Sequence, residues 1–316
     1  MLLMDAACAT LHILAMPSLP IVHAPAYDAA FAPGHRFPMG KYTRLAQLLA
    51  EQGYGDFDGF HRPGPASAEW LALAHDRQYV DQVIASRVPR LIEREIGFDV
   101  DERVSLRARL ATAGTVMAAR LALDHGIACN TAGGSHHARR AQGAGFCTFN
   151  DVAVAAHLLL ADGEVERVLV IDLDVHQGDG TAEICDGNPA IRTVSMHAEK
   201  NYPARKKLSV IDVALPDGTA DDAYLEMLDW LLPQTIEGFN PDLVFYNAGV
   251  DPHRDDRLGR LDLSDNGLLK RDRRVFSWCR RLGIPVASVL GGGYSHDIDA
   301  LSRRHLLTFQ AAAESL

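Results

Sequence analysis

Short runs of consecutive apolar residues, many of them β-branched, alternate along the chain with longer segments in which apolar residues recur every three or four positions. The short runs are typical of strands buried on both faces of a parallel sheet, and the longer period is typical of helices that bury one face. Their alternation predicts βαβ units with helices on both faces of the sheet. The expected strands are residues 20–23, 126–130, 168–172, 193–197, 243–247 and 286–290, and the expected helices are 41–51, 67–74, 81–87, 104–124, 151–160, 221–236, 264–281 and 297–313.

No linker, repeat or long block of charge divides the 316 residues. A chain of this length is ample for a substantial hydrophobic core. We therefore expect a single-domain three-layer α/β/α fold with a central, mainly parallel sheet over residues 19–316. Residues 1–18 are fairly apolar, but Asp5 interrupts them and no basic stretch precedes them, so we interpret them as an N-terminal extension and not as a signal peptide.

Composition narrows the range of partners and compartments. The formal net charge of −10 and the sequence pI of about 5.7 argue against a nucleic-acid surface spread over the whole protein. No run of 18 apolar residues is present, so no membrane-spanning helix is expected. The cysteines are odd in number and lack C-x-x-C spacing, which favours reduced thiols of a cytoplasmic protein over a cysteine zinc site. They are Cys8, Cys129, Cys147, Cys185 and Cys279.

Glycine and polar residues gather directly after four of the predicted strands. These loops span residues 131–137, 172–181, 247–256 and 291–296. Because parallel strands end at the same edge of a sheet, and ligands bind at that edge, the four loops are expected to share one rim.

The loop after the strand at 168–172 holds two groups that could bind a metal. Residues 172–180 read Asp-Leu-Asp-Val-His-Gln-Gly-Asp-Gly. Asp174 and His176 are two residues apart, so in an extended backbone they project to the same side and could bind one ion together. A carboxylate and an imidazole suit zinc, which also accepts a further carboxylate and a water. The structural alternative is a helix N-cap with its Asp and Gly turn residues.

The other three loops offer groups that complement a metal. His136 and His137 are adjacent in a glycine-rich loop, where they could activate water and protonate a leaving group. Asp251 could complete a ligand set of two Asp and one His that leaves coordination open for water and substrate. Tyr294 follows three glycines, and its phenol could donate a hydrogen bond to a developing oxyanion. Taken singly, each has a plainer explanation, such as a core histidine or an aromatic packing lid.

Taken together, these loops resemble the histone deacetylase superfamily of zinc-dependent amidohydrolases, in order from about residue 20 to the C-terminus. Residues 246–249 followed by 256–259 are most similar to the class IV branch and its bacterial relatives. The resemblance implies the arginase/deacetylase-like fold, one Zn²⁺ per chain and a structural K⁺ or Na⁺. The segments that carry it are 133–138, 145–147, 172–180, 193–195, 247–251 and 291–294.

The resemblance also assigns the metal ligands and the substrate channel. Asp174, His176 and Asp251 match the zinc ligands, and Tyr294 matches the residue that polarises the acyl carbonyl. The implied reaction is hydrolysis of an acetyl or longer acyl amide of an acyl-lysine, an acylpolyamine or a small metabolite, with no direct role for nucleic acid or membrane. The channel is assigned to Gly145, Phe146, Tyr202, Gly292 and Gly293.

Two histidine–aspartate pairs follow from the same match. Asp172 lies behind His136 and Asp179 behind His137, and such carboxylates fix the tautomer and basicity of an imidazole. By resemblance, His137 takes the proton of the attacking water and later protonates the departing amine. The monovalent-cation site is assigned to Asp172, Asp174, His176, Ser195 and the backbone of Met196.

Several positions have no firm place in these motifs. His35 and Arg36 could line an internal cavity behind the metal, but capping or surface exposure explains them equally well. Asp255 and Asp256 follow a predicted ligand, and acidic residues at the mouth would favour a cationic acyl-lysine or acylpolyamine. The aspartate that binds the substrate backbone in some family members has no clear counterpart among the acidic residues of the corresponding region, Asp99, Asp101 and Glu102.

Two other functions are open at this point. An arginase-like ureohydrolase places carboxylates and histidines around two manganese ions, but Asp251 is not part of an Asp-x-Asp pair, so a two-metal site is incomplete here. A catalytically inactive acyl-lysine-binding protein would be expected to lack a ligand, a histidine or the tyrosine, and this sequence has all of them.

Overall fold

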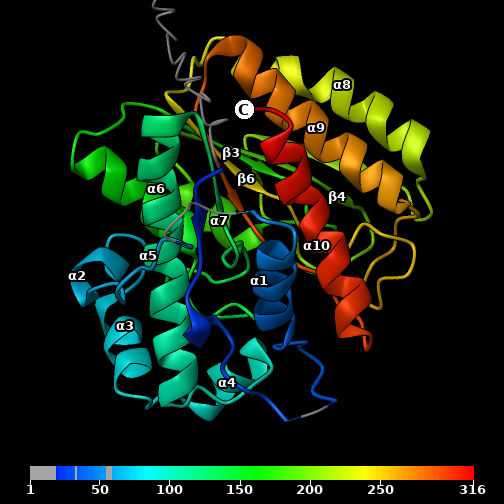
Figure 1. The fold of residues 1–316 in the computed structure, drawn as a ribbon. Helices are drawn as coiled ribbons and strands as arrows, with labels where there is room; N and C mark the ends of the chain where they lie inside the picture. Colours follow the sequence, from blue (N-terminus) through cyan, green and yellow to red (C-terminus); the bar gives the residue numbers. More distant parts are fainter. Residues whose placement is uncertain (1–18, 33, 55–58) are drawn as a thin grey trace, which may run out of the picture.

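The computed structural model describes residues 19–32, 34–54 and 59–316. Within this part, seven strands form one sheet in the order β1-β2-β7-β6-β3-β4-β5, and every neighbouring pair is parallel. The expected three-layer α/β/α class is confirmed (Figure 1). The strands are β1 (Ile21–Val22), β2 (Ile127–Asn130), β3 (Val168–Asp172), β4 (Ile191–Ala198), β5 (Ile211–Leu215), β6 (Leu243–Asn247) and β7 (Val286–Val289).

Helices cover both faces of this sheet (Figure 1). On one side, α5 (Glu102–His125) packs across β2 and β7 and is flanked by α6 (Asp151–Ala161). On the other side, α1, α10, α9 and α8 follow one another, each packed against the next. Their bounds are α1 (Lys41–Glu51), α8 (Asp221–Ile236), α9 (Asp265–Leu282) and α10 (Ile298–Ala313); the shorter helices are η1 (Pro25–Tyr27), α2 (Ala68–Leu71), α3 (Arg77–Ile84), α4 (Arg90–Ile96) and α7 (Asp179–Cys185).

Four of the longer helices begin at side-chain caps. Asp101, Asn150, Ser264 and Asp297 each accept a hydrogen bond from a backbone N–H in the first turn of α5, α6, α9 and α10, respectively. Such a cap satisfies one of the N–H groups that a helix start leaves without an intrahelical partner.

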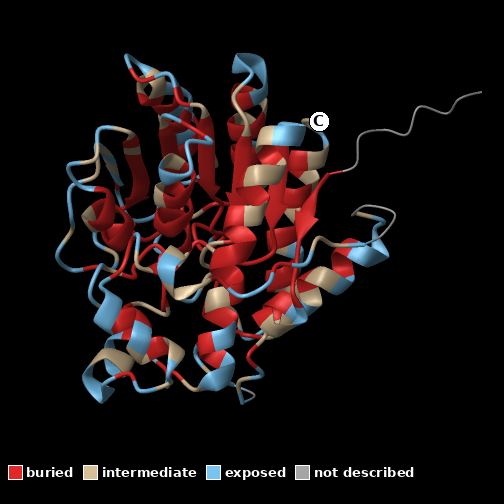
Figure 2. Ribbon diagram, turned by 90° about the vertical axis from the view of Figure 1, so that its left-hand side faces the viewer, coloured by how far each residue is buried: buried red, intermediate tan, exposed pale blue. Residues whose placement is uncertain are grey.

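The centre of the sheet is buried between the two helical layers (Figure 2). Every residue of β3 and β6 is buried, as expected for continuous apolar runs in a parallel sheet. Asp172 at the end of β3 lies opposite Asn247 of β6 and Ser195 of β4. The register therefore places polar side chains level with one another where the strands end.

The sequence pattern does not predict α4, β5 and α7. α4 has only seven residues, and β5 is an edge strand of five residues whose alternating burial differs from the continuous apolar runs that predict the other strands. α7 begins at Asp179 and Gly180, within the segment expected to be a loop because of its glycines. α3 begins at Arg77 rather than at residue 81. The predicted N-terminal extension, residues 1–18, lies outside the described residues.

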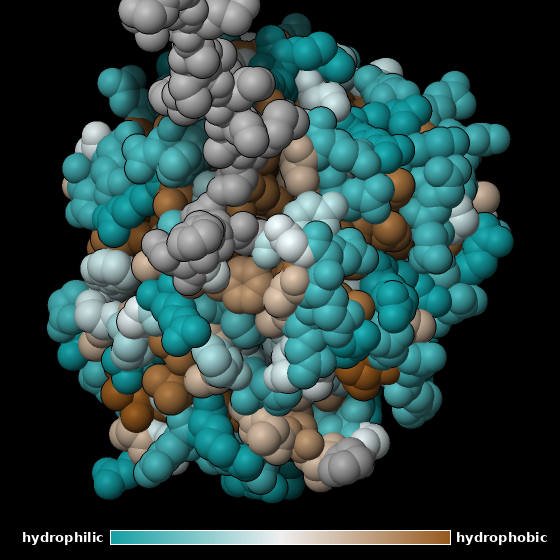
Figure 3. Space-filling model, viewed as in Figure 1, coloured by the Kyte–Doolittle hydropathy of each residue, from teal (hydrophilic) through white to brown (hydrophobic). Residues whose placement is uncertain are grey.

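The face of the molecule shown in Figure 3 is mainly hydrophilic, with apolar side chains in small separate groups. Among the helices of the described residues, none is long and apolar enough to cross a membrane.

Candidate active site

The four polar loops follow β2, β7, β6 and β3, which are consecutive neighbours in the sheet. Their backbones pack closely at the strand ends. Gly134 and Gly291 have φ values of +80° and +67°, and a Cβ at Gly134 would lie 2.6 Å from the backbone nitrogen of Gly291. At Gly291, a Cβ would lie at the same distance from the nitrogen of Gly249. Only glycine combines this conformation with so close an approach.

Asp174, His176 and Asp251 come together at this rim. Nδ1 of His176 lies 3.0 Å from Oδ1 of Asp174 and 3.1 Å from Oδ2 of Asp251. All three residues are buried, and each offers a ligand atom within 4.8 Å of the others. Gly249 and Gly292 leave room for the carboxylates, because a Cβ at either position would overlap the carboxylate of Asp174 or Asp251.

The charges of this group fit a bound cation. Burial, together with the neighbouring Asp174 carboxylate, raises the pKa of Asp251 to about 6. Burial lowers the pKa of His176, but the two carboxylates outweigh it and raise that pKa to about 10. A divalent ion would offset the repulsion between two buried carboxylates and replace the proton between them and the imidazole. Three protein ligands beside an open channel suit a catalytic metal site, in which water or substrate takes a remaining position.

His136 and His137 lie side by side, with their Nε2 atoms 3.1 Å apart. Each Nδ1 faces a carboxylate: His136 lies 2.7 Å from Oδ2 of Asp172, and His137 lies 2.7 Å from Oδ1 of Asp179. A carboxylate at Nδ1 orients the ring and leaves Nε2 for chemistry. The two histidine–aspartate pairs expected from the sequence are therefore present in the structure.

The two imidazoles have opposite protonation tendencies. Burial lowers the pKa of His136, but Asp172 and Asp174 outweigh it and raise the pKa above its usual value. Burial and the neighbouring charge on His136 lower the pKa of His137, although Asp179 opposes this. His136 is therefore the better cation of the pair, and His137 keeps an Nε2 lone pair that can accept a proton.

Asp179 and Asp172, which lie behind the two histidines, each accept further hydrogen bonds. Asp179 accepts hydrogen bonds from Nε and Nη2 of Arg139, at 3.2 and 2.9 Å. Burial raises the pKa of Asp179, but His137 and Arg139 outweigh it and lower the pKa below the usual value. Asp172 accepts a hydrogen bond from Nδ2 of Asn247 at 2.9 Å. These contacts fix the carboxylates that orient the histidines.

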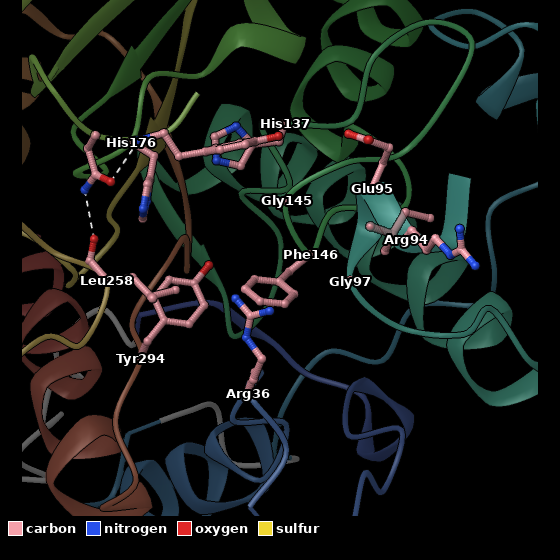
Figure 4. Close-up of a pocket in the computed structure, with 13 residues that line it drawn as sticks. Arg36, Arg94, Glu95, Gly97, His137, Gly145, Phe146, His176, Leu258 and Tyr294 are labelled. Atoms are coloured by element: carbon pink, nitrogen blue, oxygen red, sulfur yellow. Dashed lines mark hydrogen bonds between the residues drawn. The ribbon is translucent and has the colours of Figure 1, made fainter. Parts of the chain in front are cut away.

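A channel with a volume of about 390 Å³ leads from His137 and His176 to the surface (Figure 4). Phe146 and Tyr294 form part of its wall, with ring centroids 5.7 Å apart. Tyr202 stands edge-on to His137 at 4.7 Å, so it supplies another wall, as expected from the sequence. Burial and the nearby carboxylates hold the pKa of Tyr294 well above its usual value, which keeps its phenol a hydrogen-bond donor.

Phe146 has a φ of +65°, an uncommon conformation for a residue with a side chain. The last turn of α4 holds Phe146 in this conformation, because the carbonyls of that turn have no hydrogen-bond partner within the helix. The N–H of Phe146 donates to the carbonyl of Ile96 at 2.7 Å, and the N–H of Gly145 donates to that of Glu95 at 2.9 Å. A helix that the sequence pattern does not predict thus positions the predicted channel wall.

A second, smaller cavity is bounded by His136, Asp174 and Tyr294. Its volume of about 20 Å³ is little more than a single water molecule needs. Gly292 lines this inner cavity. Gly293 instead faces Val250 and Leu301, so of the two glycines assigned to the channel only Gly292 lines a cavity of the site.

Two buried cations that are not among the predicted site residues hold loops of the site. Nζ of Lys41 donates to the carbonyls of Gly291 and Gly293, at 3.3 and 3.4 Å, and burial lowers its pKa to about 8. Arg271 is fully buried in α9 and donates to the carbonyl of Gly249 at 2.6 Å. In the sequence, Arg271 stands out only as a charged residue on the apolar face of its helix. Charged residues are more often exposed, so this position alone does not predict burial.

The residues assigned to a monovalent-cation site lie close together in the sheet. Ser195 and Met196 are buried in β4, and Ser195 lies opposite Asp172 of β3. The hydroxyl of Ser195 is 3.0 Å from Nδ1 of His197. The ion itself stays a prediction.

The expectation of an acidic channel mouth built from Asp255 and Asp256 is wrong. Asp255 forms an ion pair with Arg304 at 2.8 Å. Asp256 accepts hydrogen bonds from the backbone N–H groups of Leu258 and Tyr294, at 2.8 and 2.6 Å. Both carboxylates are directed to neighbouring protein groups, and neither lines the channel.

The structure also places the other residues that had no firm position in the sequence motifs. His35 lines a separate surface cavity, and Arg36 lines the outer part of the channel, so neither lies behind the metal-capable group. Asp101 caps α5, Glu102 begins it, and Asp99 forms an ion pair on the surface. None of these three acidic residues lines the channel.

The chain matches the family model described as Histone deacetylase domain over residues 35–309. It is 43% identical over 295 residues to an uncharacterized protein of Picosynechococcus sp., covering 93% of this chain and 98% of that protein. It is 32% identical over 308 residues to histone deacetylase 2 of Arabidopsis thaliana, covering 91% and 79%, respectively. The crystal structure of the HDA15 HD domain aligns with a TM-score of 0.79 at 22% identity, covering 94% of this chain and 90% of that chain, which shows a shared fold.

The chain therefore belongs to the histone deacetylase family. Membership supports a deacetylase hydrolase that acts on acylated substrates. The family is generally metal-dependent, and the buried Asp-His-Asp group of this chain could bind a metal.

Proposed function

We propose that this protein is a zinc-dependent deacetylase that removes the acetyl group from an acylated amine. The observation that carries the proposal is the convergence of three metal-capable side chains, two aspartate-paired histidines and one tyrosine at the inner end of a single channel. A two-metal ureohydrolase is less well supported, because the described residues contain one group of three or more metal-capable side chains.

Asp174, His176 and Asp251 would hold the zinc ion, which polarises a carbonyl and lowers the pKa of a bound water from ~15.7 to about 7. Nε2 of His137, unprotonated and oriented by Asp179, accepts the proton of the attacking water. The same nitrogen then protonates the departing amine.

His136 and Tyr294 stabilise the charge that develops. His136, whose pKa is raised by its carboxylate neighbours, places positive charge beside the reacting centre. The phenol of Tyr294 donates a hydrogen bond to the carbonyl oxygen as that oxygen gains charge. Phe146 and Tyr202 flank the stem of the amine on its way out of the channel. Beside this machinery, Asp172, Asp174, His176, Ser195 and Met196 would bind a structural K⁺ or Na⁺.

The inner cavity argues for a short acyl group. A volume of about 20 Å³ accommodates little beyond an acetyl methyl, and each further methylene would have to displace close-packed protein. We expect acetylated amines to be hydrolysed faster than butyrylated ones, and long-chain acyl amines to be poor substrates.

The test is release of the free acid from acetyl-, butyryl- and long-chain acyl-lysine and from an acetylpolyamine by zinc-loaded protein. A hydroxamate chelator should abolish the activity. Tyr294→Phe should retain zinc and lower kcat by roughly 100- to 1,000-fold, the usual effect of removing an oxyanion donor. Tyr54→Phe, outside the channel, serves as the matched control.

The alternative results are distinct. A near-wild-type kcat for zinc-loaded Tyr294→Phe would exclude the role given to the phenol. Two manganese ions per chain in metal analysis would favour a ureohydrolase. Binding of acetyl-lysine by zinc-loaded protein without acetate release would favour a non-catalytic acyl-lysine-binding protein.

A further inference from the structure

The mouth of the channel carries more positive than negative side chains. Arg36 and Arg94 line it, and Glu95 is the one acidic residue of its lining. Within the described part of the chain, neither arginine forms an ion pair or a hydrogen bond through its guanidinium.

Arg36 is the arginine directed toward the substrate path. Its guanidinium carbon lies 5.8 Å from the ring centroid of Phe146, close enough for a cation–π contact with the channel wall. Figure 4 shows this guanidinium reaching toward Phe146 beside Tyr294, whereas Arg94 extends away from the channel. The next residue, Phe37, is buried, so the backbone that carries Arg36 is anchored.

The acidic residue of the lining does not neutralise this arginine, because within the described residues Glu95 forms no ion pair with Arg36. Asp255 is paired with Arg304, and the carboxylate of Asp256 is directed to backbone N–H groups, as described above. An exposed guanidinium without a partner is a ready binding group for a planar anion, because it offers several N–H donors in a fixed plane.

We propose that the channel mouth is a carboxylate-binding site with Arg36 as its specificity-determining residue. The inference rests on the proposed function, since hydrolysis at the inner end places the acetyl group inside and the rest of the amine at the mouth. The substrate class is then an N-acetylated amine whose far end bears a carboxylate. Free Nε-acetyl-lysine and a polypeptide that ends in Nε-acetyl-lysine share this chemistry, whereas internal acetyl-lysine and acetylpolyamines lack it.

Three compounds test the site on zinc-loaded protein: Nε-acetyl-lysine, its carboxamide, and N-acetylcadaverine, which is the same molecule without the carboxyl group. We expect kcat/KM to be about tenfold higher for the carboxylate compound, mainly through a lower KM, and the difference to shrink as salt is added. A short peptide ending in Nε-acetyl-lysine, compared with its C-terminal amide, distinguishes a polypeptide source from the free amino acid.

Substitutions at Arg36 test whether this residue causes the preference for the carboxylate compound. Arg36→Gln should erase the difference between the three compounds, and Arg36→Lys should retain part of it, because an ammonium keeps the charge but loses the planar donors. Arg87→Gln, an exposed arginine outside the channel lining, should leave the preference as in the wild type.

The two proposals fail separately. Equal kcat/KM for the three compounds in the wild type, or an undiminished preference in Arg36→Gln, would overturn the carboxylate site and leave the deacetylase intact. If no compound is hydrolysed, the deacetylase proposal fails, and calorimetric binding of the same compounds then tests the carboxylate site. Selective binding of the carboxylate compound that is lost in Arg36→Gln supports the site. Equal binding of the three compounds, or no binding, overturns it.

Discussion

Asp174 and Asp179 are five residues apart in the chain, yet their carboxylates contact different groups. Asp174 lies 3.0 Å from Nδ1 of His176 in the metal-capable group, whereas Asp179 lies 2.7 Å from Nδ1 of His137. The substitution Asp174→Asn should therefore lower metal affinity, because it removes a ligand charge. Asp179→Asn should keep the metal and lower kcat by about 10- to 100-fold, because the base loses the carboxylate that orients it.

Metal content by elemental analysis and kcat by acetate release separate these two effects. Asp186→Asn, an exposed acidic residue at the end of α7, is the matched control and should change neither. Loss of metal in Asp179→Asn, at an intact fold, would contradict the separation of tasks between the two carboxylates.

At the scale of elements, α9 supports the metal-capable loops through a buried charge pair. Nε of Arg271 lies 2.7 Å from Oδ1 of Asp272, and the same guanidinium donates to the carbonyl of Gly249. Asp272 also accepts hydrogen bonds from the hydroxyls of Tyr246 in β6 and Thr308 in α10, at 2.5 and 2.7 Å. One ion pair thus connects two helices to the strand end that precedes Asp251.

Arg271→Met should lower the free energy of unfolding by about 3 to 5 kcal/mol, because it leaves a buried carboxylate without its cation. Urea unfolding of metal-free protein measures this. The double variant Arg271→Met/Asp272→Asn removes both charges and should recover part of the loss. A change below about 1 kcal/mol in the single variant would mean that the pair contributes little to the fold.

The elements also show what the sequence can and cannot predict. The bounds of β3 and β6 match the expectation, because in each strand four consecutive apolar residues, buried on both faces, run into one buried polar residue. The metal-capable side chains follow these strands directly, so their convergence depends only on parallel strand order. Arg36 and Glu95 reach the channel through the packing of α4 and of the segment before α1, and this tertiary placement leaves no local pattern in the sequence.

At the scale of the whole molecule, a buried neutral histidine makes stability depend on pH. His75 is 1% exposed; its Nδ1 lies 2.8 Å from the carbonyl of Arg139, and its Nε2 accepts the N–H of Asn150 at 2.9 Å. These partners require a proton on Nδ1 and none on Nε2. Burial lowers the pKa of His75 to about 4, from 6.5 in an unfolded chain.

Between pH 6.5 and pH 4 the unfolded state binds more protons than the folded state, so the free energy of unfolding falls as the pH is lowered through this range. The contribution of His75 is on the order of 2 to 3 kcal/mol, fully present above pH 6.5 and lost by pH 4. Unfolding measured from pH 4 to 8 should show a shallower decline for His75→Gln than for the wild type. The exposed His125→Gln serves as control, and an identical slope in His75→Gln would contradict the assignment.

The channel mouth and the channel floor come from different parts of the chain. Arg36, Glu95, Tyr202 and Leu258 lie in four separate segments outside the metal-capable group. Gene libraries randomised at these four codons would therefore sample new substrate preferences while the bond-breaking residues stay constant. Natural divergence could follow the same route. Descendants of one hydrolase could acquire different substrates through changes in these loops, without an inactive intermediate.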